Sequence, residues 1–216
     1  MSIRALTVVF AAALTAAPLT AQYEKQPAAE PQAEQEVAPE PAAAPSGFLA
    51  DVATDLERTG GRLADLAGAI PADKYSWRPG EGVRSVSEVL MHVVGANHGL
   101  PLMLGAAPSG ALAEGGMQEV RGEMMRWEEE VTAKDEVIAK LKESFDYAVG
   151  AVRAMPEGSL DETVDFFGPR SRRSTVLILL THAHEHLGQS IAYARSLGVV
   201  PPWSQPAEGE APAEGR

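Results

Sequence analysis

The sequence predicts an all-α domain built as a bundle of four amphipathic helices, and three features of the chain support this fold class. Four separate segments place apolar residues at the three- and four-residue spacing of a helix, which turns about 100° per residue. Stretches rich in Gly and Pro interrupt this pattern between segments. The connection over residues 99–131 exceeds the usual helix–helix loop, and it would allow the second and third helices to run in the same direction.

The two ends of the chain are predicted to lie outside this domain. Residues 1–21 place Arg4 before a short apolar run and end in small residues, which is the pattern of a cleavable signal peptide. Residues 22–46 are almost entirely Ala, Pro, Glu and Gln, and residues 204–216 are a short acidic tail, so both are expected to be disordered. The folded domain is therefore expected over residues 47–203, and the protein is expected to be exported to the periplasm or beyond.

The first two helices are separated by a loop rich in Pro and Gly. The first helix is expected over residues 46–70, where the apolar residues keep helical spacing. Gly60 and Gly61 weaken its middle, and they mark either a bend or a close contact with another helix. Ser85 and Glu88 precede the next apolar stripe by the spacing of a capping box, which predicts the start of the second helix.

The long connection after the second helix holds several large apolar side chains. Met117, Met124, Met125 and Trp127 either line and cover a cleft or fill the core between helices. The acidic run Glu128–Glu130 that follows is expected to form a solvated face.

The last two helices are separated by a loop over residues 156–173. The third helix is expected to begin near Thr132 and to serve as scaffold. The fourth helix is expected over residues 174–197, with Ser174 as its N-cap and Gly198 after its end.

Three arginines, Arg170, Arg172 and Arg173, lie next to the N-terminus of the fourth helix. Positive charge opposes the helix dipole there, so these side chains either bind an anionic ligand or pair with the carboxylates of the same loop.

Histidines on two helices are the strongest functional signal. His182 and His186 lie one turn apart on the fourth helix, at the edge of its buried stripe. His92 has the same angular offset from the stripe of the second helix, about 120°. If the two helices pack side by side, three neutral imidazoles converge and leave an open coordination position on a bound metal ion. The alternative for His92 is a partly buried histidine with no ligand role.

Two polar residues border the same flank of the fourth helix. Glu185 and Gln189 are candidate catalytic residues, as acid/base groups or as outer partners of the ligands. His184 points away from this flank, and His98 lies about 120° from His92 near an expected frayed helix end, so both are left out of the site.

Composition narrows the partners further. The net charge is −12 and no basic stripe is present, which argues against a nucleic-acid partner. The apolar run near the N-terminus is shorter than the ~20 residues of a membrane-spanning helix, so no stable membrane span is expected. The chain has no cysteine, so a transition metal would have to be held by His and carboxylate side chains. A monomer and a homodimer both agree with the sequence.

Three segments resemble the DinB/YfiT-like superfamily of metalloenzymes: YSWRPGEGVRSVSEVLMHV, KDEVIAKLKESFDY and HAHEHLGQSIAYARSLGVVPPWS. The resemblance covers residues 47–203. It implies a four-helix bundle of up-down-down-up topology and a divalent metal, commonly nickel or zinc, held by His92, His182 and His186. Characterised relatives include S-transferases and isomerases that use a low-molecular-weight thiol, and metal-dependent hydrolases. The expected export signal distinguishes this chain from the cytoplasmic thiol-using relatives.

The expected function is therefore a metal-dependent hydrolase or transferase acting on a small molecule that the sequence does not identify. The alternative is a non-catalytic module that binds metal or another protein. The sequence contains no GxSxG elbow, phosphate loop or pair of E-x-x-H motifs that would point to a different catalytic class.

Overall fold

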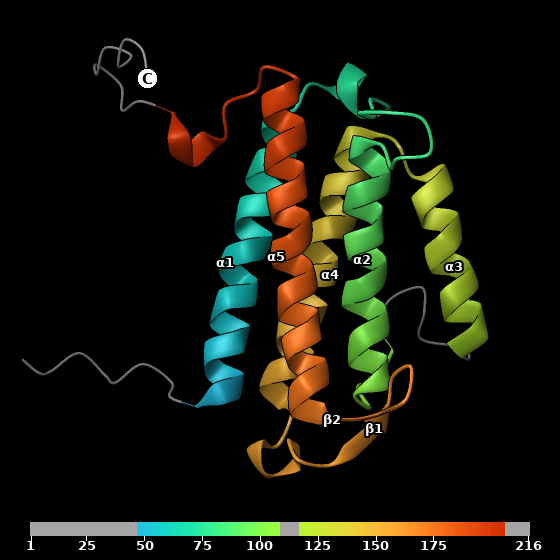
Figure 1. Cartoon of the computed structure of the whole chain (residues 1–216), viewed down its shortest axis with the longest axis vertical. Helices are drawn as coiled ribbons and strands as arrows, with labels where there is room; N and C mark the ends of the chain where they lie inside the picture. Colours follow the sequence, from blue (N-terminus) through green and yellow to red (C-terminus); the bar gives the residue numbers. More distant parts are fainter. Residues whose placement is uncertain (1–46, 109–116, 206–216) are drawn as a thin grey trace, which may run out of the picture. The chain divides into compact units, whose positions relative to one another are not determined.

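The computed structural model describes residues 47–108 and 117–205 of the chain. This part contains five α-helices and one two-stranded hairpin (Figure 1). The helices are α1 (Phe48–Ala69), α2 (Val86–Met103), α3 (Met117–Glu130), α4 (Lys134–Ala154) and α5 (Arg172–Ser196). The hairpin pairs β1 (Thr163–Asp165) with β2 (Pro169–Ser171) in antiparallel register. The predicted signal peptide, linker and most of the predicted acidic tail lie outside the described residues.

Four of the helices form the predicted bundle. α1 packs against α4 and α5, α2 packs against the same two helices, and α3 lies on the outer side of α2 (Figure 1). Each bundle helix contributes fully buried aliphatic side chains to one core, among them Leu56, Leu90, Leu141 and Leu179. Burying one such side chain stabilises the folded state by roughly 1.5–3 kcal/mol. The apolar stripes of the four helices therefore hold the bundle together.

Hydrogen bonds between helix ends show the direction of each bundle helix. The Lys134 ammonium donates to the carbonyls of Gly68 and Ile70, so α4 begins where α1 ends. The Tyr193 hydroxyl donates to the Arg84 carbonyl, so α5 ends where α2 begins. α2 and α4 therefore run in the same direction, opposite to α1 and α5, and α3 returns the chain between them.

The region expected as a long connection is largely helical, which corrects that expectation. α2 continues past Gly99 and through Pro101, and α3 follows as a helix of 14 residues. Met124 of α3 packs closely on α2, because a Cβ atom at Gly95 or Gly99 would lie only 3.1 or 3.2 Å from its Cε. Trp127 is also buried, so these two side chains fill the interface between α3 and the bundle.

Two further boundaries differ from expectation. The N-cap of α5 is Ser171 rather than Ser174, because the Ser171 hydroxyl accepts a hydrogen bond from the Ser174 amide at 3.2 Å. The loop before it contains the β1–β2 hairpin, whose strands of three residues are too short to show alternation in the sequence. The predicted capping box is confirmed, since Ser85 and Glu88 each accept a hydrogen bond from the amide of the other.

Two of the three loop arginines pair with carboxylates of the same loop. Arg172 lies 3.3 Å from Glu162, and Arg173 lies 3.8 Å from Asp161. Arg170 donates to the Phe166 carbonyl. The pairing alternative therefore accounts for Arg172 and Arg173.

Within the described ranges, no helix combines the length and the apolar content needed to cross a membrane.

Candidate metal centre

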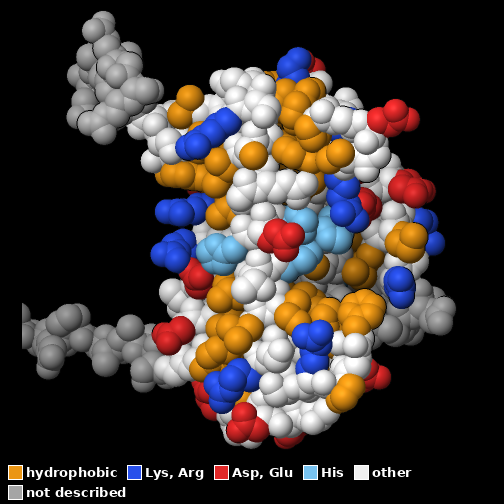
Figure 2. All heavy atoms as spheres, viewed as in Figure 1, with side chains coloured by type: hydrophobic (Ala, Val, Ile, Leu, Met, Phe, Trp, Pro, Cys, Tyr) orange, Lys and Arg blue, Asp and Glu red, His pale blue; other side chains and the backbone are white. Residues whose placement is uncertain are grey.

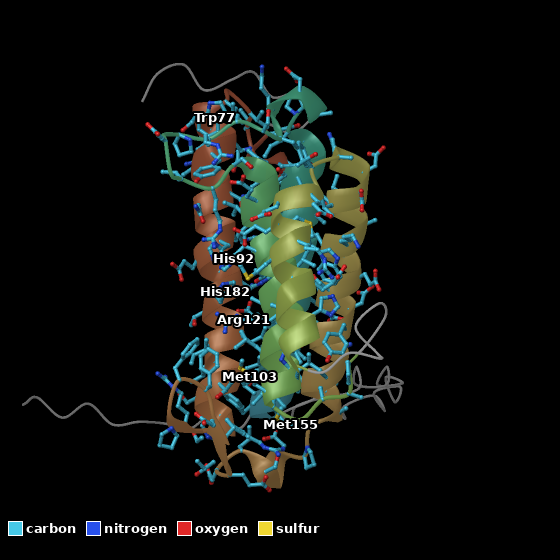
Figure 3. All side chains as sticks on the ribbon, turned by 90° about the vertical axis from the view of Figure 1, so that its right-hand side faces the viewer. Trp77, His92, Met103, Arg121, Met155 and His182 are labelled. Carbon is cyan, nitrogen blue, oxygen red and sulfur yellow. The ribbon has the colours of Figure 1, made fainter. Side chains whose placement is uncertain are left out.

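Three histidines meet between α2 and α5. α5 buries Leu179, Ala183 and Leu187 in the bundle, and this orientation turns the flank that carries His182 and His186 toward α2. α2 presents His92 from the facing flank of its own buried stripe. Figure 3 shows His92 and His182 at nearly the same height along the bundle.

The three imidazoles turn the same ring nitrogen toward one point. The Nε2 atom of His182 lies 3.1 Å from Nε2 of His92 and 3.2 Å from Nε2 of His186. One ligand atom from each of the three residues lies within 4.8 Å of the others. Zinc–nitrogen bonds of ~2.0–2.1 Å in a tetrahedral site place the ligand nitrogens about 3.3 Å apart. The spacing therefore fits a single metal ion bound by three histidines.

The electrostatics of the site favour the ligating form of these rings. Burial is the largest cause that lowers the pKa of His182 to about 3, and the positive charges of His186, His92 and Arg84 are the other causes. Burial also lowers the pKa of His92, followed by the effect of Arg84. These two imidazoles are therefore neutral near pH 7, with a lone pair available to a cation.

An amide on the same helix orients His186. Nδ1 of His186 donates to Oε1 of Gln189 at 2.8 Å, which leaves Nε2 as the ring nitrogen with the lone pair. The Gln189 amide in turn donates to the Tyr193 hydroxyl at 3.0 Å. Gln189 thus contacts a candidate ligand rather than the point where the three nitrogens converge, which is the position of an outer partner.

Glu185, the other candidate acid/base group, is exposed on α5. Its carboxylate makes no hydrogen bond or ion pair with any residue that the structure describes. The structure thus places Gln189 at the site through His186, and among the described residues it shows no hydrogen bond or ion pair between Glu185 and the three histidines.

A carboxylate that the sequence analysis missed lies beside His92. Oε2 of Glu128 is 3.4 Å from Nδ1 of His92, and its Oε1 accepts from Nε of Arg84 at 2.5 Å. Glu128 was expected on a solvated face. The signal that could have placed it is the helical spacing of Trp127 in α3 and Val131 directly after this helix, because these two apolar residues are buried and mark the inward side of the helix end.

The remaining two histidines lie outside the group. His98 is buried rather than at a frayed helix end, and its ring stacks on Tyr147 with centroids 5.1 Å apart. His184 points away as expected, and its Nε2 lies 2.8 Å from the Asp55 carboxylate. Neither ring reaches the three converging nitrogens.

Comparisons with known proteins identify the family. The family model of the DinB superfamily matches residues 55–190. A crystal structure of a DinB-like protein from Bacillus cereus is 16% identical, with a TM-score of 0.57, and the match covers 70% of this chain and 93% of that chain. A DinB-like protein from Bacillus subtilis is 17% identical, with a TM-score of 0.53, covering 73% and 99%. No curated protein matches the chain. The family model spans more than half of the sequence, so this chain belongs to the DinB superfamily.

Proposed function

We propose that this chain is a metal-dependent hydrolase or transferase that holds one divalent ion through His92, His182 and His186. The observation that carries the proposal is the convergence of three Nε2 atoms, with neighbouring distances of 3.1 and 3.2 Å. Three imidazole ligands without thiolate or carboxylate suit zinc or nickel better than magnesium or calcium, which prefer oxygen ligands.

The number of ligands favours a reactive site over a structural one. Structural zinc sites are closed by four protein ligands, whereas catalytic sites use three and keep one position open. His92 and His182 are only partly buried, and Figure 2 shows histidine atoms at the surface of the domain. A substrate can therefore approach from solvent.

The protein's own contribution is to hold neutral ligands in place. Gln189 orients His186, and Glu128 lies against the outer nitrogen of His92. Three neutral ligands leave the full double charge of a bound ion to act as a Lewis acid toward a substrate oxygen or water.

Metal content tests the proposal directly. Wild-type protein is expected to carry about one equivalent of zinc or nickel by mass spectrometry of the metals, because three nitrogen ligands suffice for tight binding. His186→Ala is expected to lose the metal while keeping its helical circular dichroism.

His184→Gln is the matched control, since His184 lies on the same helix and contacts Asp55 instead of the site. Equal metal content in wild type and His186→Ala would end the proposal. If metal binds, a panel of hydrolase and transferase substrates with metal-loaded and chelator-treated protein separates an enzyme from a non-catalytic metal-binding module.

We also propose that the protein is exported, on the strength of the signal-like pattern in residues 1–21. Expression of the full chain in a bacterial host is expected to yield a periplasmic product. Its intact mass is expected to equal that of a chain that begins at Gln22. A cytoplasmic product of full mass would contradict export.

A further inference from the structure

Arg84 lies beside the three histidines, and its backbone is linked to one of them. The Arg84 carbonyl accepts a hydrogen bond from the Tyr193 hydroxyl at 3.1 Å. Tyr193 accepts from Gln189, whose amide oxygen binds His186. The backbone of Arg84 is therefore connected through two side chains to the α5 side of the site.

The side chain of Arg84 is linked to the other side of the site. Its Nε donates to Glu128 at 2.5 Å, and the second oxygen of this carboxylate lies 3.4 Å from His92. Arg84 is therefore held at its guanidinium by Glu128, which contacts His92, and at its backbone by Tyr193, which binds the Gln189 partner of His186. Such a residue is in place before any ligand arrives, which lowers the entropy lost on binding.

The guanidinium of Arg84 keeps donors available. Its side chain is 44% exposed, and within the described ranges its side-chain hydrogen bond is made by Nε, so the Nη atoms donate no hydrogen bond there. Figure 2 shows Lys/Arg and Asp/Glu atoms beside the larger histidine patch. Burial is the largest cause that lowers the pKa of His92 and of His182. The positive charge of Arg84 is a further cause in both, so this charge acts at the site.

The balance of charge around the site favours an anion. A bound divalent ion and the Arg84 guanidinium would place two positive centres next to each other. In the described part of the chain, Glu128 is the carboxylate that pairs with Arg84 and lies against His92, and it offsets a single positive charge. A neutral ligand would leave this excess of positive charge uncompensated.

We propose that the site recognises a ligand bearing an oxyanion, a carboxylate or a phosphate, and that Arg84 is the residue that selects it. The planar guanidinium pairs with either group through parallel N–H donors, which a neutral ligand cannot match. This inference rests on the proposed metal centre and adds the class of substrate.

Ligand binding to cobalt(II)-loaded protein tests the inference, because the visible absorption of the ion changes when a ligand reaches it. Acetate, inorganic phosphate and imidazole are titrated separately, and the two anions show which oxyanion is preferred. In Arg84→Gln the dissociation constants for the anions are expected to rise about tenfold, the loss of a partly exposed charge-assisted contact. The constant for imidazole is expected to stay the same, and Arg84→Lys is expected to recover part of the loss.

Three controls keep the outcomes separate. Arg153→Gln removes an equal charge from a pair with Glu57 on the exposed surface of α4 and is expected to change nothing. The double variant Arg84→Gln, Glu128→Gln shows whether the loss of anion affinity comes only from leaving the Glu128 carboxylate without its partner. Full recovery of anion affinity in the double variant would overturn the role of Arg84. Unchanged anion binding in Arg84→Gln would also overturn it, whereas failure of the wild type to bind cobalt would overturn the metal centre itself.

Discussion

Glu128 gives His92 a negatively charged neighbour on the side of the ring that faces away from the other two histidines. A carboxylate that contacts the outer nitrogen of a ligating imidazole holds the proton there and strengthens the other nitrogen as a ligand. His182 provides a contrast, because its Nδ1 is buried without a hydrogen-bond partner among the described residues. The three candidate ligands therefore differ in how firmly they are oriented.

Removing this carboxylate is expected to weaken metal binding. Glu128→Ala is expected to lower the zinc affinity about tenfold, the lower end of the range for outer partners, because the contact is 3.4 Å long. Glu128→Gln keeps an acceptor and is expected to lose less. Zinc affinity is measured by competition with a chelator of known strength. Glu129→Ala, which changes the exposed neighbour, serves as control, and an equal loss in that variant would argue against a specific contact.

At the scale of the elements, α3 is the helix that completes the surroundings of the site. It lies outside the four-helix bundle and packs against α2 (Figure 1). Met124 reaches α2 where Gly95 and Gly99 leave room, and Trp127 packs edge-on against His98 with centroids 5.7 Å apart. This packing carries Glu128 to His92, so the position of α3 controls the electrostatics next to the candidate ligands.

The two adjacent glycines of α1 are expected to respond in opposite directions to the same substitution. A Cβ at Gly60 would lie 2.6 Å from Cγ of Phe145 on α4, so Gly60→Ala is expected to destabilise the fold by about 1–3 kcal/mol. A Cβ at Gly61 meets nothing within 4 Å, so Gly61→Ala is expected to stabilise it by about 0.5–1 kcal/mol. Urea unfolding of both variants measures the difference. Similar effects at both positions would argue against close α1–α4 packing.

At the scale of the whole molecule, the candidate metal centre joins two helices that are far apart in the sequence, α2 and α5. His92 and His182 are 90 residues apart in sequence, and they approach each other only when α2 and α5 are packed in the bundle. A metal ion bound here would stabilise the folded state, because the unfolded chain has no preformed site. Folding and metal binding would thus be coupled.

The stability of the metal-free protein is expected to decrease in acid. His182 has a folded pKa of about 3 and an ordinary value of 6.5, so between these values the unfolded chain binds a proton that the folded chain does not. The free energy of unfolding should therefore fall as the pH drops below about 6.5 toward 3. Urea unfolding at pH 7 and pH 5 measures this fall, which is expected to be smaller in His182→Gln. An equal fall in both proteins would exclude His182 as a source.

The features that were predictable from the sequence are those that depend on one helix at a time. Apolar spacing predicts the four bundle helices, the spacing of Ser85 and Glu88 predicts their capping box, and the spacing of His182 and His186 places both rings on one flank. These relations follow from the 100° turn per residue and hold before any helix meets another. His92 has the same angular offset from the buried stripe of the second helix, and this match adds a ligand from a second helix to the predicted site.

What required the folded molecule is the docking of α3 and everything that depends on it. Contacts between different segments of the chain, such as Met124 on Gly95, hold α3 against α2. This docking brings Glu128 to His92 and allows it to pair with Arg84. Local periodicity carries no information about which surface a mostly polar helix will cover, because that choice depends on the shape of the partner. The sequence could therefore assign the three histidines to one site, whereas the charged residues around them could be recognised only in the packed structure.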